Sequence, residues 1–367
     1  MKVLILGVGS AQVDAIEYCK SKGHEVYGCS YTNTEKGISL LDHFEQLNIV
    51  DIDAIKDYAV RENIDIVYSV GSDIAMPTAC KVSEDLNLPH FVSYRTAYIC
   101  NNKHLMRQEL GADFEGNTSF IVAGTKEELS AFTDFPGVIK PVDSQGQRGV
   151  YKVESLEEAQ NYFDQSISYS KSKKVILEKY LTGTEVSVNA YFINGTMKFG
   201  LVSDRISYDE YPGGIIKEHY VPAHYPQEVQ DKALDLARRV AIKLDILNGP
   251  CYFQMKVVNN VPYLLEVTPR FDGCHMWRLI YYYTGVNLLD VAFRHLLHNE
   301  INEDDLVIKK QSEELQTVFM CQAPETPVVT RPYDDAYFCR WYYDDGDKVR
   351  RMNGYMEKCG YRIEKHK

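Results

Sequence analysis

The sequence predicts a mixed α/β and α+β protein, in which a parallel sheet near the N-terminus is followed by a region of closely spaced strands. Two patterns predict this division. Over residues 1–95 short apolar runs alternate with stretches of helical spacing, which is typical of a parallel sheet with helices on both faces. From Thr118 onward the apolar runs come at shorter intervals and are joined by turn residues, which indicates an α+β region.

The composition is that of a globular protein. The chain has 367 residues, of which 45% are hydrophobic and 25% charged, enough for two or three packed units. Its net charge is −12 and no run of Lys or Arg stands out, so we expect no nucleic-acid partner. No apolar stretch approaches the length of about 18 residues that a membrane helix needs, so we expect a cytoplasmic protein without membrane contact. A homodimer remains open.

The first region begins with a β-α-β unit. The predicted elements are strands at residues 2–6, 25–30 and 65–69, helices at 13–20 and 74–86, and a helix that Asp53 caps and that reaches Arg61. Gly7 and Gly9 resemble the start of a dinucleotide-binding fingerprint, but Gln12 stands where its third glycine is needed. A tight strand-to-helix turn explains both glycines without a cofactor.

The second region contains hairpins and one long helix. The predicted strands are at residues 118–122, 138–140, 149–153, 175–179, 185–193, 196–204, 249–257 and 261–267. Asn194-Gly195 and Asn259-Asn260 mark the turns of two hairpins, and residues 227–244 have the spacing of an amphipathic helix. After residue 300 the sequence becomes charged and aromatic, and we interpret it as a small appended unit.

The nine cysteines are an odd number and include no Cys-x-x-Cys pair, which fits buried or free thiols in a reducing compartment. We therefore expect no zinc site. Cys274 stands beside His275, and we expect this pair to be a packing contact rather than a nucleophile with its base.

Residues 138–150 carry the clearest functional signal, because a strand that ends in Lys140 meets a short loop with two glycines and a second strand. Glycines let backbone N–H groups approach anionic oxygens, and the lysine adds a positive charge, so the segment suits ATP phosphates. No Gly-Lys-Ser/Thr begins a helix, so this is not a Walker loop. An ordinary hairpin with a surface lysine is the alternative.

Two further segments carry oxygen ligands. The end of the strand at Glu178–Leu181 can pair with an adenine edge, and Glu185 can accept both ribose hydroxyls, although acids at a strand end often have no role. A hairpin can bring Gln254 and Glu266 side by side as oxygen ligands for Mg²⁺, with Arg270 beside the phosphates.

The order of these elements resembles the ATP-grasp superfamily over roughly residues 1–300, and most closely its carbamoyl phosphate synthetase large-subunit-like and L-amino-acid ligase-like branch. The resemblance implies an N-terminal pre-ATP-grasp domain at 1–95 and an ATP-grasp domain at 96–300, with subdomains at about 96–178 and 179–300. Residues 301–367 would be the appended unit.

The resemblance also implies roles for single residues. The phosphates would be contacted by Lys103 and Lys140, and the glycine-rich flap would contain Ser144, Gly146, Arg148 and Gly149. The adenine hinge would be formed by Glu178, Lys179, Tyr180 and Leu181, and Glu185 would bind the ribose. The metal would be held by Gln254, Glu266 and Thr268, and Arg270 would be catalytic together with Lys140. Glutamine at position 254 matches the carbamoyl phosphate synthetase branch. Thr268 replaces the usual asparagine and is a poorer ligand, which leaves the number of magnesium ions open.

The implied activity is an ATP- and Mg²⁺-dependent ligase that joins a small-molecule carboxylate to an amine through an acyl phosphate and releases ADP and phosphate. A phosphotransferase of the same fold is the alternative, and a nucleotide-binding protein without turnover is the third reading. The stretch from Asp204 to His219 is expected to be a loop over a small acidic substrate, with Arg205, His219 and Arg270 as contacts. A surface loop without such a task is equally compatible with the sequence.

Overall fold

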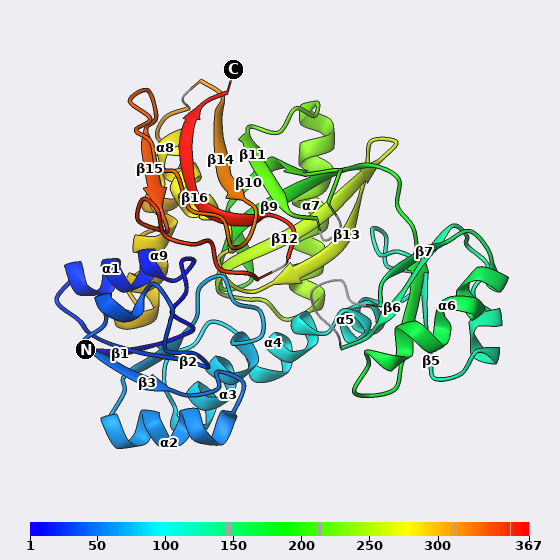
Figure 1. The fold of residues 1–367 in the computed structure, drawn as a ribbon, viewed down its shortest axis with the longest axis horizontal. Helices are drawn as coiled ribbons and strands as arrows, with labels where there is room; N and C mark the ends of the chain where they lie inside the picture. The colour runs from blue at the N-terminus through cyan, green and yellow to red at the C-terminus, as the bar shows by residue number, and fades with distance from the viewer. Residues whose placement is uncertain (144–148, 212–213, 312, 353, 367) are drawn as a thin grey trace.

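The computed structural model describes residues 1–143, 149–211, 214–311, 313–352 and 354–366, and within them the strands form three sheets (Figure 1). In Figure 1 the N-terminal sheet lies at the lower left, a large sheet at the top and a small sheet at the right. This arrangement confirms the predicted mixture of a parallel sheet with later antiparallel sheets.

The N-terminal sheet is parallel and has helices on both faces. Its strands, in the order β3-β2-β1-β4, are β3 (His43–Gln46), β2 (Glu25–Ser30), β1 (Lys2–Leu6) and β4 (Ile66–Tyr68). Its helices are α1 (Val13–Ser21), α2 (Ile52–Glu62) and α3 (Met76–Leu86), followed by α4 (Tyr94–Asn101) and α5 (Lys103–Leu110). Along β1, Val3 and Ile5 pack with α1, while Leu4 and Leu6 pack with α2 and α3, as the two-residue period of a strand requires.

Three details of this region differ from the prediction. Asp51, and not Asp53, caps α2, because its side chain accepts a hydrogen bond from the backbone N–H of Ala54. The strand β3 and the helix α4 were not predicted. Gln12 fills the turn after β1, where it is buried and donates a hydrogen bond to the carbonyl of Val70.

The small sheet is antiparallel and has its own core. Its strands, in the order β5-β8-β6-β7, are β5 (Phe120–Ala123), β8 (Val175–Lys179), β6 (Gly137–Pro141) and β7 (Tyr151–Val153). The helix α6 (Leu156–Ser168) covers it, and Phe163 on this helix is buried with Ile139 and Leu177 of the strands.

The large sheet is antiparallel. Its strands, in the order β13-β12-β9-β10-β11-β14-β16-β15, are β13 (Val261–Thr268), β12 (Gly249–Val258), β9 (Thr184–Ile193), β10 (Thr196–Ser207), β11 (Ile216–Val221), β14 (Leu315–Gln322), β16 (Glu357–Lys365) and β15 (Phe338–Trp341). The helices α7 (Gln227–Lys243), α8 (Met276–Thr284) and α9 (Leu288–His298) pack on it. Short 3-10 helices lie at η1 (Ile38–Leu40), η2 (Glu127–Ala131) and η3 (Glu303–Leu306).

The predicted hairpin turns are confirmed. Asn194 and Gly195 have φ angles of 47° and 77° between β9 and β10, which is the left-handed backbone that a type I′ turn needs. Asn259 and Asn260 have φ angles of 51° and 63° between β12 and β13.

The segment after residue 300 continues the large sheet, because β14 pairs with β11 over residues 315–318. The proposed boundary at residue 301 therefore does not coincide with a break in the sheet, and the division into domains stays a proposal. The expected loop between Asp204 and His219 is wrong in part. Both residues belong to paired strands, and Arg205 of β10 lies opposite His219 of β11 in register.

No helix among the described residues is both long and apolar enough to cross a membrane. All nine cysteines are free thiols, and seven of them are buried. His275 is hydrogen-bonded to Asp14 at 2.8 Å and to the hydroxyl of Tyr342 at 2.8 Å, so it does not act as a base toward its neighbour Cys274.

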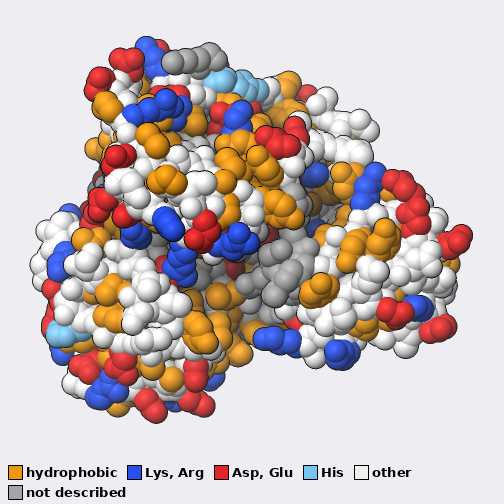
Figure 2. Space-filling model, viewed as in Figure 1, with side chains coloured by type: hydrophobic (Ala, Val, Ile, Leu, Met, Phe, Trp, Pro, Cys, Tyr) orange, Lys and Arg blue, Asp and Glu red, His pale blue; other side chains and the backbone are white. Residues whose placement is uncertain are grey.

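Charged side chains join the N-terminal part to the C-terminal strands, along the line where Figure 2 shows blue and red side chains meeting. Asp14 on α1 is 3% exposed and lies at the centre of this group of charged side chains. Its carboxylate accepts hydrogen bonds from His275 Nδ1, Arg278 Nη2 and Arg340 Nη1 at 2.8 Å each, and from Trp277 Nε1 at 3.2 Å. One buried carboxylate therefore holds α1, α8 and β15 together.

We expect the change Asp14→Asn to lower the free energy of unfolding by about 3–5 kcal/mol, because it leaves buried positive charges without their counter-charge. Urea unfolding followed by far-UV circular dichroism measures this. The matched control is Glu17→Gln, because Glu17 also pairs with Arg340 but its side chain is 43% exposed. This change should alter the free energy of unfolding by less than about 0.5 kcal/mol. Equal effects of the two changes would contradict the central role of Asp14.

Candidate functional site

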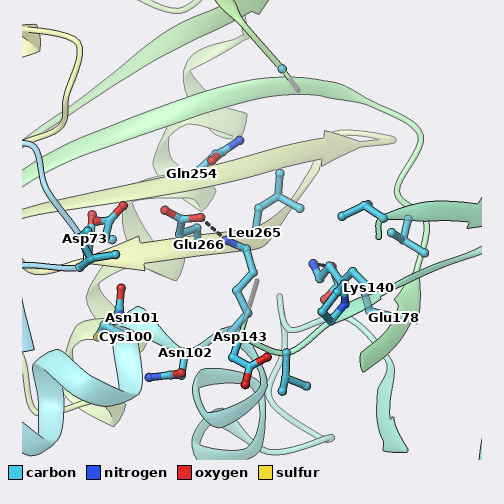
Figure 3. Close-up of a pocket in the computed structure, with 18 of the residues that line it drawn as sticks. Asp73, Cys100, Asn101, Asn102, Lys140, Asp143, Glu178, Gln254, Leu265 and Glu266 are labelled. Atoms are coloured by element: carbon cyan, nitrogen blue, oxygen red, sulfur yellow. Dashed lines mark hydrogen bonds and ion pairs between the residues drawn. The ribbon is translucent and has the colours of Figure 1, made fainter. Parts of the chain in front are cut away.

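A cavity of about 900 Å³ lies where the three sheets meet (Figure 3). Figure 3 shows Gln254 and Glu266 on neighbouring strands at its centre, with Asp73 on one side and Lys140 and Glu178 on the other. Many polar side chains line it, among them Asp73, Asn101, Asn102, Lys103, Lys140, Asp143, Lys171, Glu178, Glu185, Arg205, Gln254, Glu266 and Thr268. The cavity therefore brings together eight of the predicted site residues, namely Lys103, Lys140, Glu178, Glu185, Arg205, Gln254, Glu266 and Thr268.

The small sheet contributes a buried charge cluster. Glu178 of β8 and Lys140 of β6 form an ion pair between neighbouring strands, and Arg107 of α5 lies 3.5 Å from the second carboxylate oxygen. Glu178 is only 7% exposed, and its burial raises the pKa, but the charges of Lys140 and Arg107 more than offset this and lower the pKa to about 2. The carboxylate is therefore ionised and binds Lys140 tightly.

The hairpin of the large sheet contributes the predicted acid and amide. Gln254 of β12 lies opposite Glu266 of β13 in register, so the expected side-by-side placement is confirmed. Glu266 forms an ion pair with Lys103 at the start of α5. Burial raises the pKa of Glu266, but the positive charge of Lys103, with smaller contributions from Arg270 and Arg205, lowers it below its ordinary value.

Glu185 and Arg205 form an ion pair between β9 and β10, and the amide nitrogen of Gln254 donates a 2.8 Å hydrogen bond to Glu185. Only 11% of the Arg205 side chain is exposed. Because this ion pair lines the cavity, the low exposure of Arg205 does not remove it from reach of a bound molecule. Arg205 thus lines the cavity from a strand and not from a loop, and its role as a substrate contact stays a proposal.

Arg270 lies just behind the cavity wall at 4% exposure. Its Nε donates a 2.8 Å hydrogen bond to Asp73, its Nη2 also bonds Asp73, and its Nη1 donates to the carbonyl of Phe271 at 2.6 Å. Asp73 follows β4, so this pair joins the N-terminal sheet to the end of β13. Arg270 is thus held in one orientation by a residue that itself lines the cavity.

The other hinge and flap residues are placed differently. The described residues that line the cavity include Glu178 but not Lys179, Tyr180 or Leu181. Lys179 is exposed and paired with Asp134 at 2.9 Å. Tyr180 lies beneath the ammonium groups of two lysines, and the carbonyl of Leu181 accepts a 3.2 Å hydrogen bond from a lysine.

Three of the four flap residues, Ser144, Gly146 and Arg148, lie outside the described residues. Gly149 is described and has a φ of 74°. A Cβ at this position would lie 2.8 Å from the Tyr169 ring and 3.1 Å from Pro141. Packing and backbone conformation therefore both require glycine here.

His219 was predicted as a substrate contact, and this prediction is wrong. The residue is fully buried on β11 and is not among the residues that line the cavity. Burial, aided by the nearby positive charges of Arg205 and Lys358, lowers the pKa of His219 well below its ordinary range, so the imidazole is neutral. The sequence could not place it because the predicted loop is a strand.

Sequence reasoning missed Asp73 and Arg107. Asp73 could have been found, since it follows the carboxyl end of a parallel strand, where α/β sheets place ligand contacts. Arg107 stands four residues after Lys103 on α5 and therefore shares a helix face with it. Asn102, which precedes the same helix and lines the cavity, carries no comparable signal.

We expect Glu178→Gln to lower the free energy of unfolding by about 3 kcal/mol at pH 7, since a carboxyl pKa of about 2 instead of about 4.3 is worth that much. Because the pKa of Glu178 is lower in the folded state than in the unfolded state, its ionised carboxylate stabilises the folded protein at pH values above the unfolded pKa. This contribution is lost as the pH falls toward 2. In urea titrations, the unfolding free energies of wild type and variant should therefore begin to approach each other as the pH falls below about 4.3. A difference independent of pH would contradict this account.

Comparison with known proteins agrees with this geometry. Residues 133–277 match the family profile described as ATP-grasp domain. The C-terminal section of the carbamoyl phosphate synthase large chain of Aquifex aeolicus is 28% identical over 152 residues, which are 40% of this chain and 28% of that protein. The phosphoribosylamine–glycine ligase of Methanobrevibacter smithii is 30% identical over 208 residues, which are 53% of this chain and 47% of that ligase. The chain thus spans less than half the length of these curated relatives.

Two solved structures have the same fold. Phosphoribosylglycinamide synthetase from Anaerococcus prevotii superposes with a TM-score of 0.82 at 17% identity, covering 100% of this chain and 94% of that one. L-amino acid ligase from Bacillus licheniformis superposes with a TM-score of 0.80 at 17% identity, covering 100% and 93%. Residues 133–277 thus match the ATP-grasp domain, and the chain is similar to carbamoyl phosphate synthase in sequence and to L-amino acid ligase in fold, as its sequence predicts.

Proposed function

We propose that the protein is an ATP- and Mg²⁺-dependent ligase that joins a small-molecule carboxylate to an amine through an acyl phosphate. One observation carries this proposal. A single cavity collects an acid and an amide in register on one hairpin, Gln254 and Glu266, and faces them with Lys103 and Lys140 from two other parts of the fold. The curated relatives support it, because their names describe a carbamoyl phosphate synthase and a glycine ligase.

The cavity suits a nucleotide triphosphate by size and charge. Its volume of about 900 Å³ is at the upper end of typical ligand sites. Among the described residues, four cationic side chains line it, Lys103, Lys140, Lys171 and Arg205, together with five carboxylates, and three of the cations are paired with carboxylates. A phosphate chain would share these cations with the carboxylates, which is compatible with charge-assisted hydrogen bonds.

The donor set also suits Mg²⁺, which prefers hard oxygen ligands and keeps one or two protein carboxylates together with phosphate oxygens. Glu266 would supply the carboxylate. The amide nitrogen of Gln254 is engaged by Glu185, so its carbonyl oxygen is the atom left for a metal. The buried hydroxyl of Thr268 has no hydrogen-bond partner among the described residues and lines the cavity. When bound, the ion would neutralise charge on the transferred phosphoryl group.

In the proposed reaction a carboxylate oxygen of the substrate attacks the γ-phosphorus of ATP, the bond to the bridging oxygen breaks, and ADP leaves. The amine then attacks the acyl carbon, loses a proton, and phosphate leaves. Lys140 would stabilise the transferred charge, and Arg270, held by Asp73, would orient the acid. The roles assigned to Lys103 and Glu185, phosphate and ribose binding, belong to the same proposal.

The first test supplies ATP and MgCl₂ with pools of amino acids and small carboxylates, and follows phosphate release, nucleotide products and product mass. We expect ADP and phosphate, released fast only when an acid and an amine are both present, because the acyl phosphate needs a second acceptor. AMP and pyrophosphate would contradict the mechanism. Full turnover with one acceptor and a stable phosphorylated product would instead identify a phosphotransferase.

The second test concerns the metal ligands. We expect Glu266→Gln to reduce turnover at least about 100-fold, because it removes the carboxylate of the proposed metal site. Gln254→Ala should raise the Mg²⁺ requirement, and Gln254→Glu should be partly tolerated. Glu228→Gln, at a 79% exposed side chain on α7, is the matched control and should behave as wild type. Mg²⁺ titrations with thermal melts measure this, and wild-type behaviour of Glu266→Gln would place the metal elsewhere.

A further inference from the structure

A second group of side chains with metal-ligand chemistry lies outside the cavity, between β11 and the segment that leads from β13 to α8. It consists of His219, Asp272 and Cys274, whose ligand atoms all lie within 4.8 Å of one another. Their exposures are 0%, 5% and 7%. The three residues come from two segments that are more than fifty positions apart in the sequence, so the fold and not local sequence brings them together.

These side chains have polar atoms without partners. A backbone group of Asp204 lies close enough to the ring of His219 to interact with it. Among the described residues, however, neither ring nitrogen makes a hydrogen bond of good geometry, and neither does Oδ2 of Asp272. The other oxygen of Asp272 accepts a 3.1 Å hydrogen bond from the backbone N–H of Met276, which fixes the carboxylate at the start of α8. A buried polar group without a partner typically costs about 1–3 kcal/mol. A ligand bound between His219 and Asp272 would give one ring nitrogen and the free carboxylate oxygen a partner.

We propose that His219, Asp272 and Cys274 form a structural site for one transition-metal ion of borderline softness, with Zn²⁺ the ion that fits best. Imidazole nitrogen, thiolate sulfur and carboxylate oxygen together are ligands that zinc accepts, whereas Mg²⁺ requires oxygen ligands. This site differs from the proposed Mg²⁺ site on the hairpin, and it departs from the expectation, drawn from cysteine spacing, that the chain has no zinc site.

The geometry admits such an ion. Three atoms that are at most 4.8 Å apart have a common point within about 2.8 Å of each, and zinc bonds are about 2.0–2.3 Å long, so side-chain shifts below an ångström close the site. The neutral ring of His219 has a lone pair to offer. A thiolate and a carboxylate together balance the double positive charge of the ion.

Burial raises the pKa of the Cys274 thiol, and the positive charge of Lys358 opposes this only in part. Lys358 of β16 places its ammonium 3.5 Å from the sulfur, where it can donate to a metal-bound thiolate as a supporting hydrogen bond. Arg205, which lies opposite His219 in register, has its own counter-charge in Glu185. Thr317 of β14 also lies opposite His219, and its buried hydroxyl has no partner among the described residues, so one more oxygen stands on this face.

The site lies where a bound ion would link two parts of the fold. Residues 269–275 connect β13 to α8 and include Arg270, while β11 is the neighbour of the strand that carries Arg205. An ion held by His219, Asp272 and Cys274 would tie this connection to the large sheet and so fix the wall of the cavity from behind.

The test measures metal content and is independent of the ligase activity. The full chain is produced in zinc-supplemented medium, purified without chelator, and its zinc is measured by mass spectrometry. We expect about one equivalent in wild type and a small fraction of that in His219→Gln and in Cys274→Ser. A strong chelator should lower the melting temperature of wild type but not of the two variants.

Exposed histidines provide the control. His224, Glu314 and His366 form a surface group that can also attract added zinc. The variant His366→Gln should keep the zinc and the chelator effect. Loss of zinc in His366→Gln alone would overturn the proposal, and so would wild type without zinc.

A spectroscopic measurement keeps the proposal falsifiable if a buried variant folds poorly. With Co²⁺ in place of zinc, wild type should show the charge-transfer absorption of a cobalt–thiolate bond, and Cys274→Ser should lack it. A wild-type Co²⁺ spectrum without thiolate absorption would overturn the proposal.

Discussion

Buried charge that must be paired is the constraint on which this structure depends. Taking an ion out of water costs several kcal/mol unless an opposite charge lies beside it. The chain meets this condition by pairing charges from different elements: Glu178 with Lys140 and Arg107, Glu266 with Lys103, Glu185 with Arg205, and Asp73 with Arg270. Three of these pairs join different parts of the fold around one cavity: Lys103 of α5 with Glu266 of β13, Arg107 of α5 with Glu178 of β8, and Asp73 after β4 with Arg270 after β13.

The same constraint explains how the cavity is suited to anions. Three of the cations that line it among the described residues are paired with carboxylates, so a bound phosphate chain would share cations that the protein already holds in position. This sharing costs less than burying a new cation would, and it places the negative charge of the ligand where Glu178 and Glu266 already hold Lys140 and Lys103 in position. The unpaired hydroxyl of Thr268 adds a polar contact that the protein alone does not satisfy.

The sequence predicted most of the strands, helices and hairpin turns, because local patterns determine them. The period of apolar residues and the Asn-rich turns suffice for β9, β10, β12 and β13, and the register of one hairpin then follows, which is why Gln254 and Glu266 were placed correctly. Asp73 and Arg107 were missed because their roles depend on contacts with distant residues. His219 was misplaced because eight residues between β10 and β11, rich in tyrosine and glycine, hid a second strand.

The group of His219, Asp272 and Cys274 could not be predicted from the spacing of residues in the sequence. A motif such as Cys-x-x-Cys can be found in a sequence because both ligands lie on one local turn. In this chain Asp272 and Cys274 are close in sequence, but the third group depends on the register of β11 against β10 and β14, which no local pattern specifies. The absence of a spacing motif therefore excludes only sites built within one segment. Sites assembled by a sheet become visible when the partners of each buried polar atom are counted, and the ring of His219 makes no hydrogen bond of good geometry among the described residues.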